Sequence, residues 1–115
     1  MTDELDAMLP LTPQVYQILL ALADGERHGY AIMQEVEERS EGRMRLGAGT
    51  LYGAIKRLRQ LGLIEELAAG SEAEESRRRT YGLTSRGRAV AVAETQRMER
   101  LVEAARSKRL VPRPA

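Results

Sequence analysis

The sequence predicts a mainly α-helical fold with a small two-stranded β-hairpin, in which three short helices precede the hairpin and one long helix follows it. Its length of 115 residues suits a single domain. Apolar residues recur at helical spacing in four segments, and two short apolar segments flank a stretch of small and charged residues. Aromatic residues make up only 3% of the chain. We therefore expect one aliphatic core.

The first helix has clear start and stop signals. Thr12 before Pro13 is typical of an N-cap followed by proline in the first turn. The pattern predicts a helix from about Pro13 to Ala23, ended by Asp24 and Gly25 because glycine readily closes a helix.

The second helix is predicted over residues 29–40, where polar side chains alternate with apolar ones at helical spacing. Gly42 ends this pattern. The residues expected to form its buried stripe are Tyr30, Ile32, Met33 and Val36.

The third helix is predicted from Leu51 to Leu61, after a turn over residues 47–50. It carries no acid, since none occurs between Arg43 and Gly62. One face is apolar and expected to be buried, and it holds Leu51, Ala54, Ile55, Leu58 and Leu61.

Two antiparallel strands are predicted next, from Leu63 to Leu67 and from Arg79 to Leu83, joined by a long tip. Thr84 or Ser85 is expected to cap the last helix, which extends to about Lys108 and leaves residues 111–115 as a flexible tail. An apolar stripe on this helix holds Ala91, Met98, Leu101, Val102 and Ala105.

Three helices followed by a hairpin, with basic residues on the third helix, form a winged helix-turn-helix pattern. Four short motifs strengthen it: His28-Gly29-Tyr30, Gly49-Thr50-Leu51-Tyr52, Leu61-Gly62-Leu63-Ile64 and Tyr81-Gly82-Leu83-Thr84. With these motifs, most of residues 12–88 resembles the PadR family of bacterial transcription regulators. The resemblance implies a winged helix-turn-helix domain over residues 1–84 and a dimerisation helix over residues 85–110.

Charge is distributed unevenly along the chain. Residues 1–42 hold nine acidic and two basic residues, whereas residues 43–115 hold eight acidic and sixteen basic residues. Most of these basic residues are arginines, whose planar group suits phosphates and base edges. We therefore expect double-stranded DNA as a partner. The candidate DNA contacts are Thr50, Tyr52, Lys56, Arg57, Arg59, Arg77, Arg78, Arg79, His28 and Tyr30.

Several of these residues also have a purely structural interpretation. Thr50 is suited to a phosphate at a helix start or to an ordinary N-cap. Tyr52 is suited to a DNA contact or to packing under the wing, while Tyr30 is suited to the core and His28 to a cap. The three consecutive arginines follow Glu72, Glu74 and Glu75, which either pair with them or keep the wing tip away from DNA.

Other function classes are excluded by composition. The chain has no cysteine and one histidine, so a structural zinc site and a nucleophile–base pair both lack residues. We expect neither an enzyme nor a cofactor. The acidic N-terminus is unlike a targeting peptide, and no apolar run is long enough to span a bilayer, so we expect a cytoplasmic protein without membrane contact.

The predicted function is a sequence-specific DNA-binding regulator, expected to be a repressor, that acts as a homodimer on a pseudo-palindromic operator. The alternative is a winged-helix module for protein assembly without specific DNA binding. The resemblance also implies a small hydrophobic effector, although the chain lacks the tryptophans that hold one in a multidrug-binding branch of the family. The residues predicted to form the dimer contact are Met98, Leu101, Val102 and Ala105.

Overall fold

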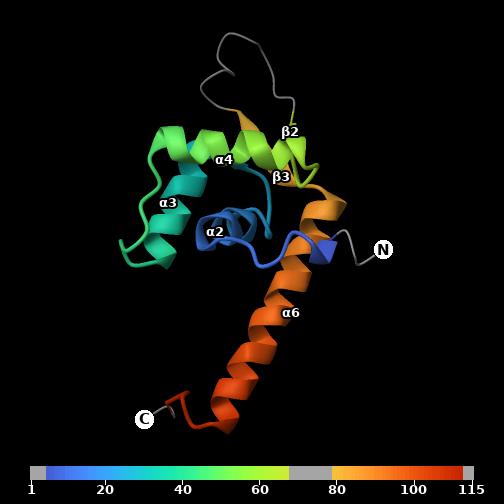
Figure 1. Ribbon diagram of the computed structural model, residues 1–115. Helices are drawn as coiled ribbons and strands as arrows, with labels where there is room; N and C mark the ends of the chain where they lie inside the picture. Colours follow the sequence, from blue (N-terminus) through green and yellow to red (C-terminus); the bar gives the residue numbers. More distant parts are fainter. Residues whose placement is uncertain (1–4, 68–78, 113–115) are drawn as a thin grey trace.

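The computed structural model describes residues 5–67 and 79–112. They form a helical domain with a small sheet at one side and a long terminal helix that extends away from it (Figure 1). The predicted fold class is confirmed. The elements are α2 (Pro13–Ala21), β1 (Arg27–His28), α3 (Gly29–Arg39), α4 (Ala48–Gln60), β2 (Ile64–Leu67), β3 (Thr80–Leu83) and α6 (Ser85–Ser107).

The predicted caps of α2 and α6 are confirmed. Val15 N–H donates to the Thr12 hydroxyl at 3.1 Å, and Gly87 N–H donates to the Thr84 hydroxyl at 2.9 Å. Helix α2 ends at Ala21, two residues before the predicted end, because the chain turns there toward Gly25, whose φ is +153°.

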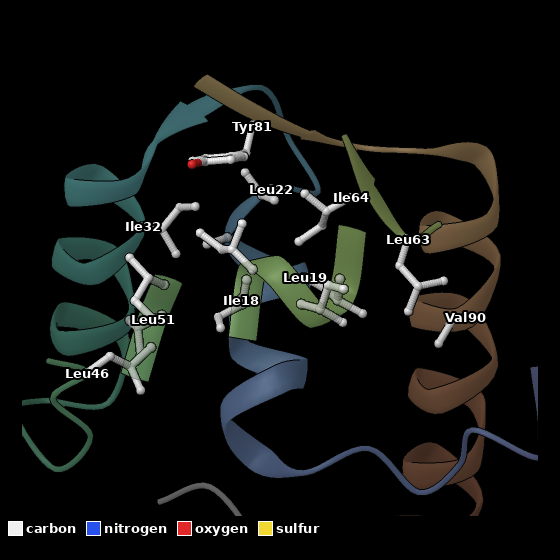
Figure 2. Close-up of a cluster of buried hydrophobic side chains, with 14 residues drawn as sticks. Ile18, Leu19, Leu22, Ile32, Leu46, Leu51, Leu63, Ile64, Tyr81 and Val90 are labelled. Carbon is white, nitrogen blue, oxygen red and sulfur yellow. The ribbon is translucent and has the colours of Figure 1, made fainter. Parts of the chain in front are cut away.

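The core surrounds α2, which supplies three buried side chains from the middle of the domain (Figure 2). It is aliphatic as predicted, except for Tyr81, which is 2% exposed. The larger side chains of the core are Ile18, Leu19, Leu22, Ile32, Val36, Leu46, Leu51, Ile55, Leu58, Leu63, Ile64, Tyr81 and Val90.

The sheet has three strands among the described residues, one more than predicted. The added strand, β1, pairs antiparallel with β3, so that the order is β1-β3-β2. Strand β1 has two residues, Arg27 opposite Tyr81 and His28 opposite Thr80. So short a strand lacks the alternation from which strands are predicted.

The prediction that Tyr30 belongs to the buried stripe of the second helix is wrong, because its side chain is 64% exposed. Gly29, Ile32 and Val36 form the buried side of α3 instead. His28 occupies the N-cap position without a side-chain capping bond, which also contradicts the expected cap.

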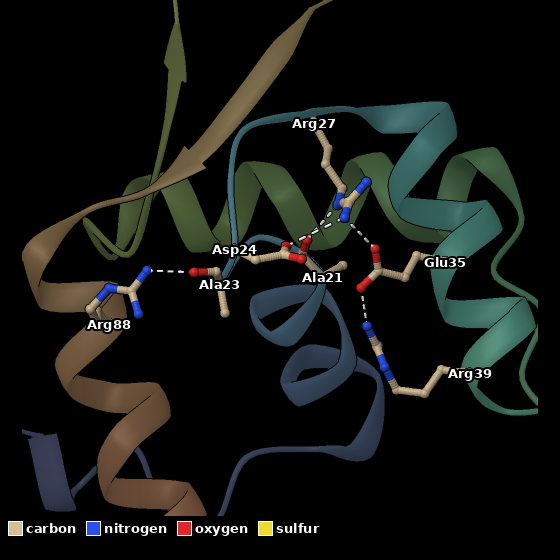
Figure 3. A network of polar contacts seen from close by, with 7 residues as sticks. All are labelled: Ala21, Ala23, Asp24, Arg27, Glu35, Arg39 and Arg88. Atoms are coloured by element: carbon tan, nitrogen blue, oxygen red, sulfur yellow. Dashed lines mark hydrogen bonds and ion pairs between the residues drawn. The ribbon is translucent and has the colours of Figure 1, made fainter.

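Two arginines satisfy carbonyl groups at the C-terminal end of α2 (Figure 3). Arg27 donates to the Ala21 carbonyl at 2.7 Å, and Arg88 of α6 donates to the Ala23 carbonyl at 2.7 Å. Cations are favoured at this end of a helix by the helix dipole. Glu35 of α3 also lies 2.7 Å from Arg27, so ion pairs and hydrogen bonds fix α2 against both neighbouring helices.

The segment before α2 packs on the domain, and this contact was not predicted from the sequence. Leu5, Met8, Leu9 and Leu11 lie against the core. Leu11 N–H donates to Glu94 of α6 at 3.1 Å. Helical spacing of the first three of these residues is the signal that could have revealed the contact.

Glu94 is the described acid that lies deepest, with 2% of its surface exposed. Arg97 donates to its two oxygens at 2.6 and 3.0 Å. The hydrogen bonds from Arg97 lower the pKa of Glu94, burial opposes this shift, and the Leu11 N–H adds to the lowering. The charged carboxylate therefore stabilises the fold.

We expect Glu94→Gln to lower the free energy of unfolding by about 1 to 3 kcal/mol at neutral pH, because charge-assisted hydrogen bonds are lost. Because the folded-state pKa of Glu94 is lowered, the stabilisation is complete above the ordinary pKa of a glutamate in the unfolded chain and is lost as the pH falls through the folded-state pKa. Denaturant unfolding at several pH values should show the difference from wild type shrinking in acid. The exposed Glu103→Gln is the control, and a pH-independent difference would contradict the prediction.

Candidate nucleic-acid interface

Helix α4 is held against the domain by one buried face, formed by Leu51, Ile55 and Leu58, as predicted. The predicted helix start is wrong. Helix α4 begins at Ala48, and Gly47 is its N-cap without a side-chain bond, so Thr50 lies inside the first turn and caps nothing. Leu61 is also not part of the buried face, because it follows the helix as its C-cap and is 43% exposed.

The opposite face of α4 is exposed to solvent, carries two glycines and has no acidic residue. Gly49, Gly53, Lys56 and Gln60 lie on it at spacings of three and four residues, and all are exposed. A Cβ atom at Gly49 or Gly53 would have no neighbour within 4 Å. Because glycine disfavours a helix interior, neither glycine is explained by packing inside the protein.

Tyr52 lies on the flank of α4 that faces α3. A Cβ atom at Gly29 would overlap the Tyr52 hydroxyl and would lie 2.8 Å from its ring carbon Cζ. Gly29 is therefore required for this close approach, which joins the first two sequence motifs. Tyr52 remains 41% exposed, so it packs within the domain and also faces solvent.

Arg59 lies on the same flank two turns later and reaches the sheet. Its Nη1 is 3.0 Å from Oε1 of Glu66 on β2, while Nε of Arg79 is 3.6 Å from Oε2 of the same residue. Tyr81 lies opposite Glu66 in the sheet, and burial, followed by the Glu66 charge, raises the pKa of its hydroxyl. Both arginines were predicted as DNA contacts, whereas the acid between them was not predicted to belong to the site.

Thr50 and Arg57 lie on the other flank of α4, seven residues apart, and both are exposed. The amide groups of Ala48, Gly49 and Thr50 are in the first turn, where amides have no acceptor inside the helix. A phosphate oxygen is favoured at such an end by these donors and by the helix dipole.

His28 and Tyr30 lie at the start of α3, beside the sheet. The His28 Nδ1 and the Thr80 hydroxyl are 3.1 Å apart, which ties β1 to β3. Tyr30 is exposed and available to a partner. Arg77 and Arg78, with Glu72, Glu74 and Glu75, lie outside the described residues.

The apolar stripe of α6 continues the line of its buried face beyond the domain. Gly87, Val90 and Glu94 are covered, whereas the next turns extend away from the other elements (Figure 1). Leu101 is 58% exposed and Val102 is 45% exposed. Met98 and Ala105, on the same side, are partly exposed.

Residues 5–67 and 79–112 contain no group of three or more His, Asp or Glu side chains that could hold a metal ion. No helix in this part of the chain is long and apolar enough to cross a membrane.

Comparison with known proteins gives a family and a fold. The model of the family described as "Transcriptional regulator PadR-like family" matches residues 18–93. An uncharacterised 37.1 kDa protein in transposon TN4556 of Streptomyces fradiae is 43% identical over 84 residues, which are 73% of this chain and 22% of that protein. This chain thus spans less than a quarter of that relative.

Two solved structures share the fold at low sequence identity. A transcriptional regulator from Clostridium thermocellum has a TM-score of 0.67 and 22% identity, with 91% of this chain and 96% of that chain covered. A PadR family transcription regulator from Clostridium difficile has a TM-score of 0.67 and 24% identity, with 81% and 94% covered. Both support the winged helix described above.

Proposed function

The chain belongs to the PadR-like family of transcriptional regulators, and from this premise we propose that it is a homodimeric repressor that binds a pseudo-palindromic DNA operator in the cytoplasm. The family consists of DNA-binding regulators and not of enzymes. We propose that residues 1–84 bind DNA and that residues 85–110 form the dimer contact.

The open, acid-free face of α4 is the observation that carries this proposal. In a helix-turn-helix the second helix enters the major groove, which is wide enough to admit one helix. Lys56 and Arg57 are proposed to contact base edges, while Thr50 contacts phosphates together with His28, Tyr30 and Tyr52. Arg59 and Arg79 are proposed as the remaining cations of this DNA-facing surface. Arg77 and Arg78, which lie outside the described residues, remain proposed contacts to the DNA backbone.

The exposed stripe on α6 supports a two-fold dimer. An apolar surface that continues from a buried face into solvent is typical of a partner contact. In a two-fold dimer the same stripe of each subunit meets its copy, and two α4 helices are then offered to successive major grooves on one side of the DNA.

Selection of bound fragments from random duplex DNA tests the proposed function. We expect the selected sites to be pseudo-palindromic, with half-sites separated by whole helical turns. Affinity should fall steeply as the salt concentration rises, because bound phosphates release counterions. No enrichment and no salt dependence would favour the alternative of a protein-assembly module.

The glycines of α4 give a separate test of which face meets DNA. We expect Gly53→Leu to leave the unfolding temperature unchanged or to raise it, because leucine favours a helix by roughly 0.5 to 1 kcal/mol over glycine and its Cβ meets open space. DNA affinity should nevertheless fall by about tenfold or more, since the larger side chain keeps α4 out of the groove. Unchanged affinity in a folded variant would move the interface to another face.

A cavity of about 220 Å³ between α2 and α6 is the site we propose for a small hydrophobic effector. Leu20, Leu83 and Val92 give it a largely apolar lining, and the hydroxyls of Tyr16 and Thr95 lie 2.6 Å apart at its edge. A bound effector would contact the dimerisation helix and the DNA-binding domain together. The test is a titration with apolar aromatic compounds, followed by NMR. Chemical-shift changes confined to these residues would support the proposed effector site, and the absence of such changes would contradict it.

A further inference from the structure

Glu66 is an acid placed among the cations of the proposed DNA surface. Each of its two carboxylate oxygens faces a different arginine, Arg59 of α4 at 3.0 Å and Arg79 beside β3 at 3.6 Å. The side chains of the two arginines are 46% and 50% exposed, whereas that of Glu66 is 27% exposed. A single carboxylate thus holds one cation from the helix and one from the wing.

These ion pairs border an open groove and not the core. The groove, about 490 Å³ in volume, lies between α4 and β2, and both Glu65 and Glu66 line it with Lys56 and Arg59. Ion pairs with this degree of exposure contribute little to folding stability. Folding stability therefore does not explain why Glu66 lies on a surface that is proposed to bind phosphates.

We propose that Glu66 is a specificity-determining residue that restrains Arg59 and Arg79 and so weakens binding to DNA of the wrong sequence; this inference rests on the proposed function. A released arginine can contact a phosphate at any sequence, and each such contact adds sequence-independent affinity. The carboxylate occupies both arginines and repels an incoming phosphate. Specificity gains from an element that penalises the wrong partner as much as from contacts with the right one.

The penalty falls mainly on non-specific binding. On its operator α4 is held by base contacts from Lys56 and Arg57, neither of which pairs with Glu66. Arg59 and Arg79 therefore remain on Glu66 in that complex. On other sequences α4 lacks these base contacts, so affinity depends on how many phosphates the surface can reach.

The test compares Glu66→Gln with wild type on the selected operator and on a scrambled duplex over a range of salt concentrations. We expect the variant to bind the scrambled duplex about tenfold more tightly and to change little on the operator, so that the ratio of the two affinities falls. The slope of log affinity against log salt on the scrambled duplex should become steeper by about 1 to 2, one for each phosphate gained. Thermal unfolding would show that the variant is folded.

Glu65→Gln is the matched control, because it removes the same charge from the same groove. Unlike Glu66, Glu65 forms no ion pair with a residue of 5–67 or 79–112. The control should leave the slope unchanged. In an Arg59→Gln/Arg79→Gln background, Glu66→Gln should also have no effect on the slope, because the restrained cations are gone.

Equal affinity gains on both duplexes from Glu66→Gln and Glu65→Gln would overturn the inference, since net charge alone would then explain them. An unchanged slope in Glu66→Gln, with the operator preference of wild type intact, would overturn it as well and leave the proposed function standing. A wild-type protein that does not distinguish the two duplexes would instead overturn the proposed function, and with it the role of Glu66.

Discussion

Leu101→Glu is expected to convert the protein into monomers and to lower its affinity for the operator by roughly 10² to 10⁴, the range gained when two binding units are linked. Leu101 is 58% exposed on a stripe that continues the buried face of α6. In a two-fold contact the substitution places two carboxylates in one apolar interface. Sedimentation would report the mass, and titration of an operator duplex would report the affinity.

Val92→Glu is the control for this prediction. Val92 belongs to the same helix and is similarly exposed, at 49%, but it lies off the stripe. We expect the Val92 variant, measured without effector, to remain dimeric and to bind DNA, since Val92 lines only the cavity proposed for the effector. Circular dichroism should show both variants folded. A Leu101 variant that stays dimeric and binds normally would place the dimer contact elsewhere.

Helices were predictable from sequence wherever an apolar stripe faces one continuous core. The spacing of Leu51, Ile55 and Leu58 identified the buried face of α4, and the capping residues Thr12 and Thr84 identified two helix starts. Such signals are local, since periodicity and capping depend on a few neighbouring residues.

Features that depend on distant contacts were not predictable. Strand β1 exists because Arg27 and His28 lie beside β3, more than fifty residues later. Tyr30 follows the helical pattern of a core residue, yet it points to solvent because Gly29, Ile32 and Val36 define the buried side of α3. Glu94 looks like any surface acid in the sequence, and only its contacts with Leu11 and Arg97 make it internal.

The sequence predicted which cations belong to the candidate site, but not how they are placed relative to one another. The acid-free third helix indicated Lys56, Arg57 and Arg59 together, whereas the structure separates Arg57 from Arg59 on opposite flanks of α4. The link from Arg59 to Glu66 crosses from a helix to a strand, so no helical spacing reveals it.

Base reading and phosphate positioning should be separable by substitution. We expect Lys56→Ala and Arg57→Ala each to reduce the discrimination between operator and scrambled duplex by about 1 to 3 kcal/mol per half-site, the range for a good contact with a base. In a homodimer each change acts in both half-sites, which gives a combined loss of roughly 10² to 10⁴ in the affinity ratio. Thr50→Ala should instead weaken both duplexes to a similar degree, because a phosphate contact carries no sequence information.

Affinities of the three variants for both duplexes, measured at one salt concentration, decide between the two roles. Lys56 and Arg57 are exposed, and neither forms an ion pair with another described residue, so their substitution leaves the fold intact. Thr50 is also exposed and does not cap the helix, so Thr50→Ala is expected to leave the fold intact as well. If the Lys56 and Arg57 variants lose affinity equally on both duplexes, the open face of α4 positions the protein on DNA, and the bases are read by another part of the surface.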